Sequence, residues 1–78
     1  MTKYYKSESE DAVCYLIISS NNDSIGITLW NDDLIDVNVV NITENDLLSE
    51  QQCPPEEALA AYHKFENRCK EIINSTGV

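Results

Sequence analysis

The clearest indication of the fold comes from residues 12–42, AVCYLIISSNNDSIGITLWNDDLIDVNVVNI. It contains three runs rich in strand-forming residues, at about 12–19, 25–30 and 34–42, separated by two runs of Asn, Asp and Ser. In the first run, apolar side chains fall on both faces of an extended chain, as expected of a central strand. The Asn- and Asp-rich runs favour tight turns because their side chains hydrogen-bond locally. The stretch therefore predicts an antiparallel meander.

The flanking segments extend this meander on both sides. Tyr4 and Tyr5, with lysines beside them, predict a short edge strand at about residues 3–7. After the meander, a Thr-x-x-Asp sequence resembles a helix N-cap and predicts a helical turn at about residues 44–49. Residues 49–53 are expected to form a linker without regular structure. The predicted sheet therefore has three or four strands.

One amphipathic helix is predicted at about residues 55–73. It begins at a Pro-Pro-Glu-Glu sequence, where proline is tolerated and carboxylates complement the positive end of the helix dipole. On a helical wheel the apolar side chains form one stripe: Ala58, Ala61, Tyr62, Phe65, Cys69, Ile72 and Ile73, with Leu59 at its margin. This stripe must cover the sheet, since a small meander cannot bury enough apolar surface alone. We expect one small acidic α+β domain over residues 1–78, with a three- to four-stranded antiparallel meander, a short helical turn and a C-terminal helix packed on one sheet face.

Charge is distributed unevenly along the chain. The net charge is −9, and residues 7–63 contain twelve carboxylates but no lysine or arginine. A hydrophobic fraction of 42% is nevertheless that of a globular chain. Nucleic acids and anionic lipids bind clustered lysine and arginine, so the composition argues against both and favours a basic protein partner. A surface of a single charge sign opposes folding unless it steers a partner of opposite sign.

The sequence predicts a cytoplasmic protein. No signal-peptide pattern is found, and the longest apolar run, residues 13–18, is far shorter than the ~20 residues that cross a bilayer. Three cysteines, Cys14, Cys53 and Cys69, match neither a disulfide framework nor a zinc site, as expected of thiols in a reducing compartment. We expect Cys14 and Cys69 to be small core residues.

No residue pattern predicts an enzyme, a cofactor or a metal site. His63 has no catalytic partner in the sequence and is expected on the exposed face of the helix. With two glycines in the chain, there is no glycine-rich phosphate loop. A calcium-loop spacing that starts at Asn21 fails, because Ile25 stands where an oxygen ligand is needed. We therefore expect a protein without catalytic activity.

The candidate partner-binding residues are one aromatic side chain and two groups of carboxylates. They are Trp30, Asp32, Asp33 and Asp36 in the first group and Glu8, Glu10 and Asp11 in the second. An exposed tryptophan surrounded by carboxylates is typical of a binding anchor. Alternatively, Trp30 packs with Tyr15 and with Tyr4 or Tyr5 in a small cluster on the second face of the sheet. The sequence leaves both interpretations open.

By its size, its charge and its α+β class, the chain resembles phage- or plasmid-encoded inhibitors and toxin-neutralising immunity proteins. No motif carries this resemblance, which is one of class alone. It implies an antagonist that occludes the basic site of a nuclease or another nucleic-acid-binding protein, with carboxylates standing where phosphates bind. The second hypothesis is a structural or oligomerising module that associates through an exposed strand or through the Trp30 face.

Overall fold

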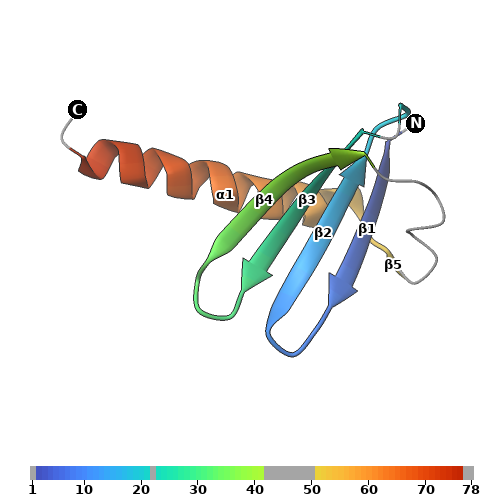
Figure 1. Ribbon diagram of the computed structural model, residues 1–78, viewed down its shortest axis with the longest axis horizontal. Coiled ribbons are helices and arrows are strands. Elements are labelled where there is room, and N and C mark those ends of the chain that lie inside the picture. Colours follow the sequence, from blue (N-terminus) through green and yellow to red (C-terminus); the bar gives the residue numbers. More distant parts are fainter. Residues whose placement is uncertain (1, 22, 42–50, 77–78) are drawn as a thin grey trace.

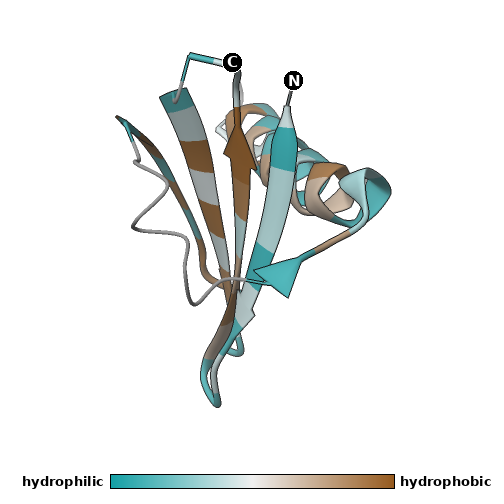
Figure 2. Cartoon of the chain, turned by 90° about the vertical axis from the view of Figure 1, so that its right-hand side faces the viewer, coloured by the Kyte–Doolittle hydropathy of each residue, from teal (hydrophilic) through white to brown (hydrophobic). Residues whose placement is uncertain are grey.

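The structure is a computed structural model that describes residues 2–21, 23–41 and 51–76. Its elements are β1 (Lys3–Glu8), β2 (Ala12–Ile18), β3 (Asp23–Trp30), β4 (Ile35–Asn41), β5 (Gln51–Gln52) and α1 (Pro55–Ser75). Figure 1 shows the four long strands side by side with α1 behind them. Figure 2, turned by 90°, shows the helix on one side of the sheet. The predicted α+β fold is confirmed.

The sheet is an antiparallel meander with one added strand. The strands lie in the order β4-β3-β2-β1-β5, so the apolar strand β2 is central, as the sequence indicated. The four predicted long strands agree with the structure to within two residues at each described end. The prediction of a linker at 49–53 was wrong at Gln51 and Gln52, which pair with β1. The predicted helical turn at 44–49 lies outside the described residues.

Strand register decides which side chains face the helix. Tyr15 lies opposite Ile27, which in turn lies opposite Val37. Because side chains alternate between faces, this row and the rows two residues away share the helix-covered face. Tyr4 belongs to the same face, since it pairs with Ile17 two residues after Tyr15. Thr28 and Trp30 lie on the opposite face.

The core forms where the first half of α1 crosses the sheet. Ile27 and Ala58 are completely buried, and Ala61 and Tyr15 are 3% and 8% exposed. Alanine at two successive turns of the helix lets its backbone approach the strands closely, and larger side chains around it fill the layer. The predicted apolar stripe is therefore correct for the first half of α1.

The second half of α1 extends beyond the sheet. Figure 1 shows it projecting past β4, the edge strand. Ile72 and Ile73, which the sequence placed on the sheet-facing stripe, are 49% and 60% exposed. The expectation that the whole stripe packs on the sheet was therefore wrong, because the helix is longer than the sheet is wide.

A cluster of charged and polar side chains fastens the start of α1 to β1. Lys6 Nζ lies 3.0 Å from Glu57 Oε2 and 2.8 Å from Glu8 Oε1. Hydrogen bonding, first to Lys6 and then to the Tyr15 hydroxyl, lowers the pKa of the Glu57 carboxyl. The same two carboxylates raise the pKa of the Lys6 ammonium. Glu57 was expected to act through the helix dipole, and its pairing with β1 was not foreseen.

Candidate functional site

The two predicted groups of carboxylates lie at the same end of the sheet. In a meander, alternate turns share an end, so the β1–β2 and β3–β4 hairpins are neighbours. Figure 1 shows both turns at the lower end of the sheet. Six carboxylates gather there, and we call them the acidic rim: Glu8, Glu10, Asp11, Asp32, Asp33 and Asp36. Asp23, at the start of β3, lies at the opposite end.

Asn31 joins the two hairpins directly. Its backbone N–H donates to the carbonyl oxygen of Asp11 at 2.9 Å, and its side-chain Nδ2 donates to the carbonyl oxygen of Glu10 at 2.8 Å. These two bonds hold the turn that carries Asp32 and Asp33 against the turn that carries Glu10 and Asp11. The acidic rim is therefore one connected surface rather than two separate loops.

Local backbone geometry fixes the β3–β4 turn. The N–H of Asp33 donates to the Trp30 carbonyl oxygen at 3.2 Å, and the N–H of Trp30 donates to the Leu34 carbonyl oxygen at 2.9 Å. Asp33 has a φ of 68°, in the left-handed region that Asp tolerates better than most residues. This is the three-residue hairpin loop built from a type I turn and a left-handed residue. The Asn-Asp-Asp sequence suits it.

Ser9 makes the β1–β2 turn equally compact. Its N–H donates to the Ala12 carbonyl oxygen at 2.9 Å, its hydroxyl donates to the same oxygen at 3.1 Å, and the Ala12 N–H donates back to the hydroxyl at 3.2 Å. Glu10 and Asp11 occupy the two central positions of this closed turn, and both are exposed. Their carboxylates are therefore presented on an ordered backbone.

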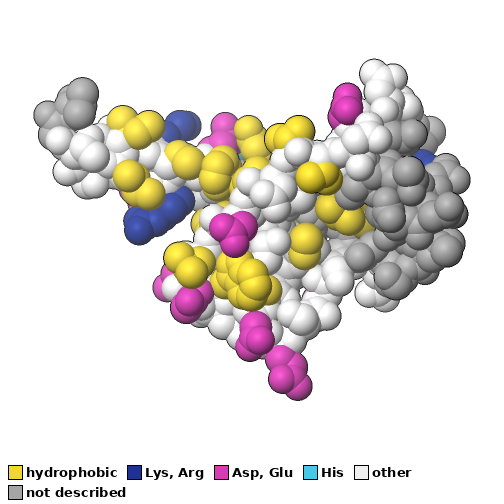
Figure 3. Space-filling view, viewed as in Figure 1, with side chains coloured by type: hydrophobic (Ala, Val, Ile, Leu, Met, Phe, Trp, Pro, Cys, Tyr) yellow, Lys and Arg dark blue, Asp and Glu magenta, His cyan; other side chains and the backbone are white. Residues whose placement is uncertain are grey.

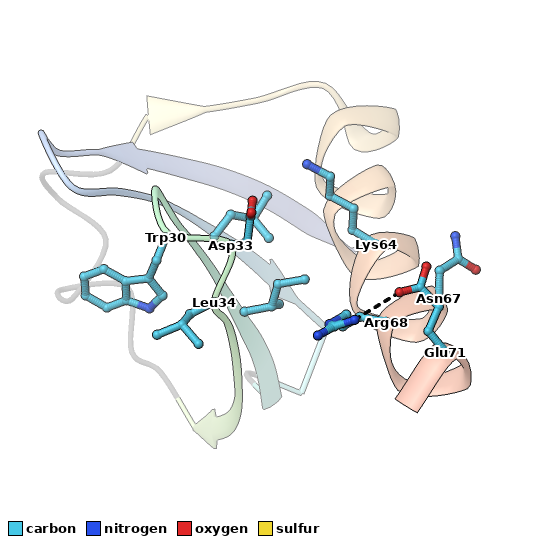
Figure 4. Close-up of a pocket in the computed structure, with 9 residues that line it drawn as sticks. Trp30, Asp33, Leu34, Lys64, Asn67, Arg68 and Glu71 are labelled. Carbon is cyan, nitrogen blue, oxygen red and sulfur yellow. Dashed lines mark hydrogen bonds and ion pairs between the residues drawn. The ribbon is translucent and has the colours of Figure 1, made fainter. Parts of the chain in front are cut away.

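Trp30 is exposed at the acidic rim and is not part of a core. It retains 41% of its surface, and its indole Nε1 donates to Asp36 Oδ2 at 2.9 Å. The interpretation of a cluster with Tyr15 and with Tyr4 or Tyr5 was wrong. Tyr15 and Tyr4 lie on the helix-covered face, and Tyr5, although on the same face as Trp30, pairs with Leu16, four residues along β2 from the partner of Trp30. Figure 4 shows the indole pointing away from the helix. A charge-assisted hydrogen bond holds the ring beside a carboxylate.

Five of the six rim carboxylates have no ion-pair partner among the described residues. Glu8 is the exception, because Lys6 pairs with it. Asp32, Asp33 and Asp36 are all exposed. Figure 3 shows acidic side chains at the lower end of the molecule and up its lower left side, with apolar surface between them. The site combines negative charge with the apolar side chains of Trp30 and of Leu34, which is 61% exposed.

A groove of about 570 Å³ lies beside the site, between the β3–β4 hairpin and the projecting half of α1. Leu29, Leu34 and Ile35 line it from the sheet, and Lys64 and Arg68 line it from the helix (Figure 4). Arg68 Nη1 lies 3.2 Å from Glu71 Oε2, so part of its charge is compensated. The sheet side of the groove is mainly apolar but includes Asp33, and the helix side carries both basic side chains and Glu71.

Residues considered for catalysis lie away from the acidic rim. His63 is on the exposed face of α1, as expected, and its Nδ1 lies 2.9 Å from Glu66 Oε1. The three cysteines are free thiols and are half-buried rather than core residues. Burial raises the pKa of the Cys53 thiol, which makes the reactive thiolate scarcer.

The described residues contain neither a metal-binding cluster nor a membrane-spanning helix. In ranges 2–21, 23–41 and 51–76, no group of three or more His, Cys, Asp or Glu side chains is placed to hold a metal ion. Within the same ranges, no helix combines the length and the apolar character needed to cross a membrane.

Two features of the site were not predicted from the sequence. Asn31 was assigned only to a turn, although it connects the hairpins. Leu34 was assigned to a strand, although it adds exposed apolar surface next to Trp30. Asn is common in loops, so the residue type of Asn31 did not indicate a contact with the first hairpin. Only the fact that alternate turns of a meander lie at the same end of the sheet could have suggested it.

No protein-family model, curated protein or solved structure matches this chain. Evidence for function therefore comes from the geometry and charge of the chain itself.

Proposed function

We propose that the protein is a small acidic antagonist that binds a basic, nucleic-acid-handling partner protein and occludes its nucleic-acid site. The observation that carries the proposal is the convergence of both carboxylate groups and Trp30 on one ordered end of the sheet. The carboxylates would stand where phosphates of the nucleic acid bind. Trp30 and Leu34 would supply apolar contact inside the charged surround, as binding anchors do.

Several properties of the acidic rim support recognition rather than solubility alone. Carboxylates gathered at one end repel one another, whereas a solubilising surface can mix charge signs. Rim residues stand on two hydrogen-bonded turns, so little conformational entropy is lost when a partner binds. The electrostatic attraction also acts beyond contact distance, because the net charge of −9 draws in a basic partner and speeds their encounter.

The proposed mechanism is steric and electrostatic occlusion. No chemical step is needed, and a partner held by the acidic rim would be unable to bind nucleic acid at the same surface. Nucleic acid and this protein should therefore compete for the partner. Binding should weaken as salt is added, since exposed charges are screened over about 8 Å at physiological ionic strength.

The test is capture from a bacterial lysate at low salt, followed by elution with duplex DNA. The wild-type protein is compared with the combined variant Glu10→Gln, Asp11→Asn, Asp32→Asn and Asp33→Asn. The matched control is Asp23→Asn, which removes charge at the other end of the sheet. We expect nucleic-acid-binding proteins to be captured by the wild type and the control, released by DNA, and lost with the combined variant. Capture that the combined variant retains, or that DNA does not release, would contradict the proposal.

A further inference from the structure

The outer edge of β4 is open in the described part of the chain. It is the last strand of the sheet, with β3 on one side and no described strand on the other. Its seven residues, IDVNVVN, include one charged side chain, Asp36, and no lysine or proline. The strand pairs with β3 in unbroken register from Ile35 to Asn41, so no bulge distorts it. Lysine, proline and bulges usually protect an edge strand, because its outward N–H and C=O groups are otherwise free to pair with a strand of another molecule.

Apolar surface remains uncovered on both sides of the vacant strand position. On the sheet, Val39 is 78% exposed and lies on the helix-covered face, since it pairs with Ile25. Above the vacant position, the projecting half of α1 carries Ile72 and Ile73, which are 49% and 60% exposed. Figure 1 shows this half of the helix extending past β4. A strand added beside β4 would therefore lie under the helix.

We propose that a second copy of this chain occupies this position, with the β4 strands of the two copies paired antiparallel about a two-fold axis. The pairing joins two five-stranded sheets into one continuous sheet. The axis is perpendicular to the sheet, so both helices lie on the same side. Such an interface uses the same surface patch on both copies, which is the commonest arrangement of homodimers.

The chain carries both halves of this interface, which favours a second copy over another strand. The helix passes its own β4 near Ile35, where the groove lies. Antiparallel pairing with the two-fold axis at Val37 places Val39 of the second copy beside Ile35. The projecting helix, with Ile72 and Ile73, then covers Val39 of the second copy, and the reciprocal contact forms on the other side of the axis. The most exposed large apolar residue of the strand thus meets the apolar end of the other helix.

Charge is also compatible with this pairing. In a two-fold antiparallel pair, a residue faces its own copy only when it lies on the axis. The axis at Val37 places each Asp36 opposite Asn38 of the other copy. The two Asp36 carboxylates therefore do not lie directly opposite each other. Because the strands run in opposite directions, the two acidic rims lie at opposite ends of the joined sheet.

The available surface fits a small interface. Specific interfaces begin at about 600 Å² per partner, which is about a tenth of the 5711 Å² surface of the chain. The β4 edge and the projecting helix from Arg68 to Ser75 together make up about a fifth of the residues. We therefore expect a dimer with a dissociation constant on the order of micromolar. Salt should strengthen the dimer, because it screens the repulsion between two copies that each carry a net charge of −9.

The test is sedimentation equilibrium of the full chain from about 1 μM to about 1 mM, the weak limit of specific association. The variant Val39→Lys places a charge in the interface, against the apolar side chains of Ile72 and Ile73 of the second copy. We expect it to raise the dimer dissociation constant roughly a hundredfold, about tenfold for each of the two symmetric sites. The control Leu59→Lys adds the same charge on the first half of α1, at a side chain that is 40% exposed, and should leave the constant within about twofold.

The outcomes separate this proposal from the role of the acidic rim. A dimer that Val39→Lys dissociates and that salt strengthens supports β4 pairing, whether or not the acidic rim binds a basic partner. Slower amide exchange at alternate β4 residues in concentrated samples gives a second, independent measure. A monomer at all concentrations overturns the proposal. So does a dimer that is insensitive to Val39→Lys or that is lost on Trp30→Ala.

Discussion

Removing charge from the acidic rim should make the folded protein more stable. The perturbation is the double variant Asp32→Asn and Asp33→Asn, which takes the net charge from −9 to −7. Asn tolerates the left-handed backbone that Asp33 adopts, with its φ of 68°, so the turn is preserved. The Trp30 bond to Asp36 is left intact. The variant therefore changes charge and little else.

The magnitude follows from the repulsions that folding creates. Folding brings the two removed charges next to Glu10 and Asp11 of the other hairpin, so about four repulsive pairs are relieved. At a separation of about 10 Å in water, each pair costs about 0.4 kcal/mol before screening. With screening lengths of about 30, 8 and 3 Å, the total gain is about 1.2 kcal/mol at 10 mM salt, about 0.5 at 150 mM and below about 0.1 at 1 M.

The assay is urea unfolding followed by the fluorescence of Trp30, the single tryptophan of the chain. Midpoints are compared at the three salt concentrations, with Asp23→Asn as the control at the far end of the sheet. The expected result is a stabilisation that shrinks as salt is added and that the control lacks. A variant that is less stable than the wild type at low salt would show that the carboxylates of Asp32 and Asp33 stabilise the fold rather than oppose it.

Three further predictions concern the fold. Glu57→Gln should lower the free energy of unfolding at pH 7, and the difference from the wild type should shrink as the pH falls below about 4.5. The reason is that the pKa of the Glu57 carboxyl is lowered in the folded state, so its ion pair with Lys6 stabilises the fold only while the carboxyl is ionised. Thermal unfolding from pH 7 to pH 3 measures this difference. Ile27→Val should lower the free energy of unfolding by about 1 kcal/mol, because Ile27 is completely buried. Ile73→Val should change it very little in a monomer, because Ile73 is 60% exposed. Equal losses for the two variants in urea unfolding would contradict the assigned core. Asn31→Ala should cost about 1 kcal/mol through loss of the 2.8 Å bond to the first hairpin, and amide exchange in residues 9–12 should rise if that bond orders the turn.

Local pattern explains what could be predicted of the fold. Alternating apolar residues in 25–30 and the Asn-Asp-Asp turn after them specify a hairpin by short-range chemistry, and both strands formed within two residues of the predicted ends. Gln51 and Gln52 have no local pattern that predicts a strand. Their pairing with β1 is a long-range contact, which a local pattern does not contain. The helical wheel identified the apolar side of α1. It contained no information about the width of the sheet, so the exposure of Ile73 could not be foreseen.

The site shows the same division between local and long-range information. Five of the six carboxylates of the acidic rim were assigned to turns from their sequence context, and Asp36 was assigned to the predicted strand at 34–42. That Trp30 lies on the face opposite Ile27 also followed from alternation. The face of Tyr15 depended on the register between β2 and β3, which sequence alone did not determine. The contact between Asn31 and the carbonyl oxygen of Asp11 likewise depends on how the two hairpins lie together in the sheet.

We propose that the acidic rim binds a partner in place of nucleic acid. The decisive measurement is the affinity of the purified protein for a captured nucleic-acid-binding partner, followed by Trp30 fluorescence at increasing salt and with duplex DNA as competitor. We predict that the dissociation constant rises steeply with salt, that DNA displaces the protein, and that neutralising Glu10, Asp11, Asp32 and Asp33 weakens binding at least about a hundredfold. An affinity unchanged by salt, by DNA and by these substitutions would contradict the claim.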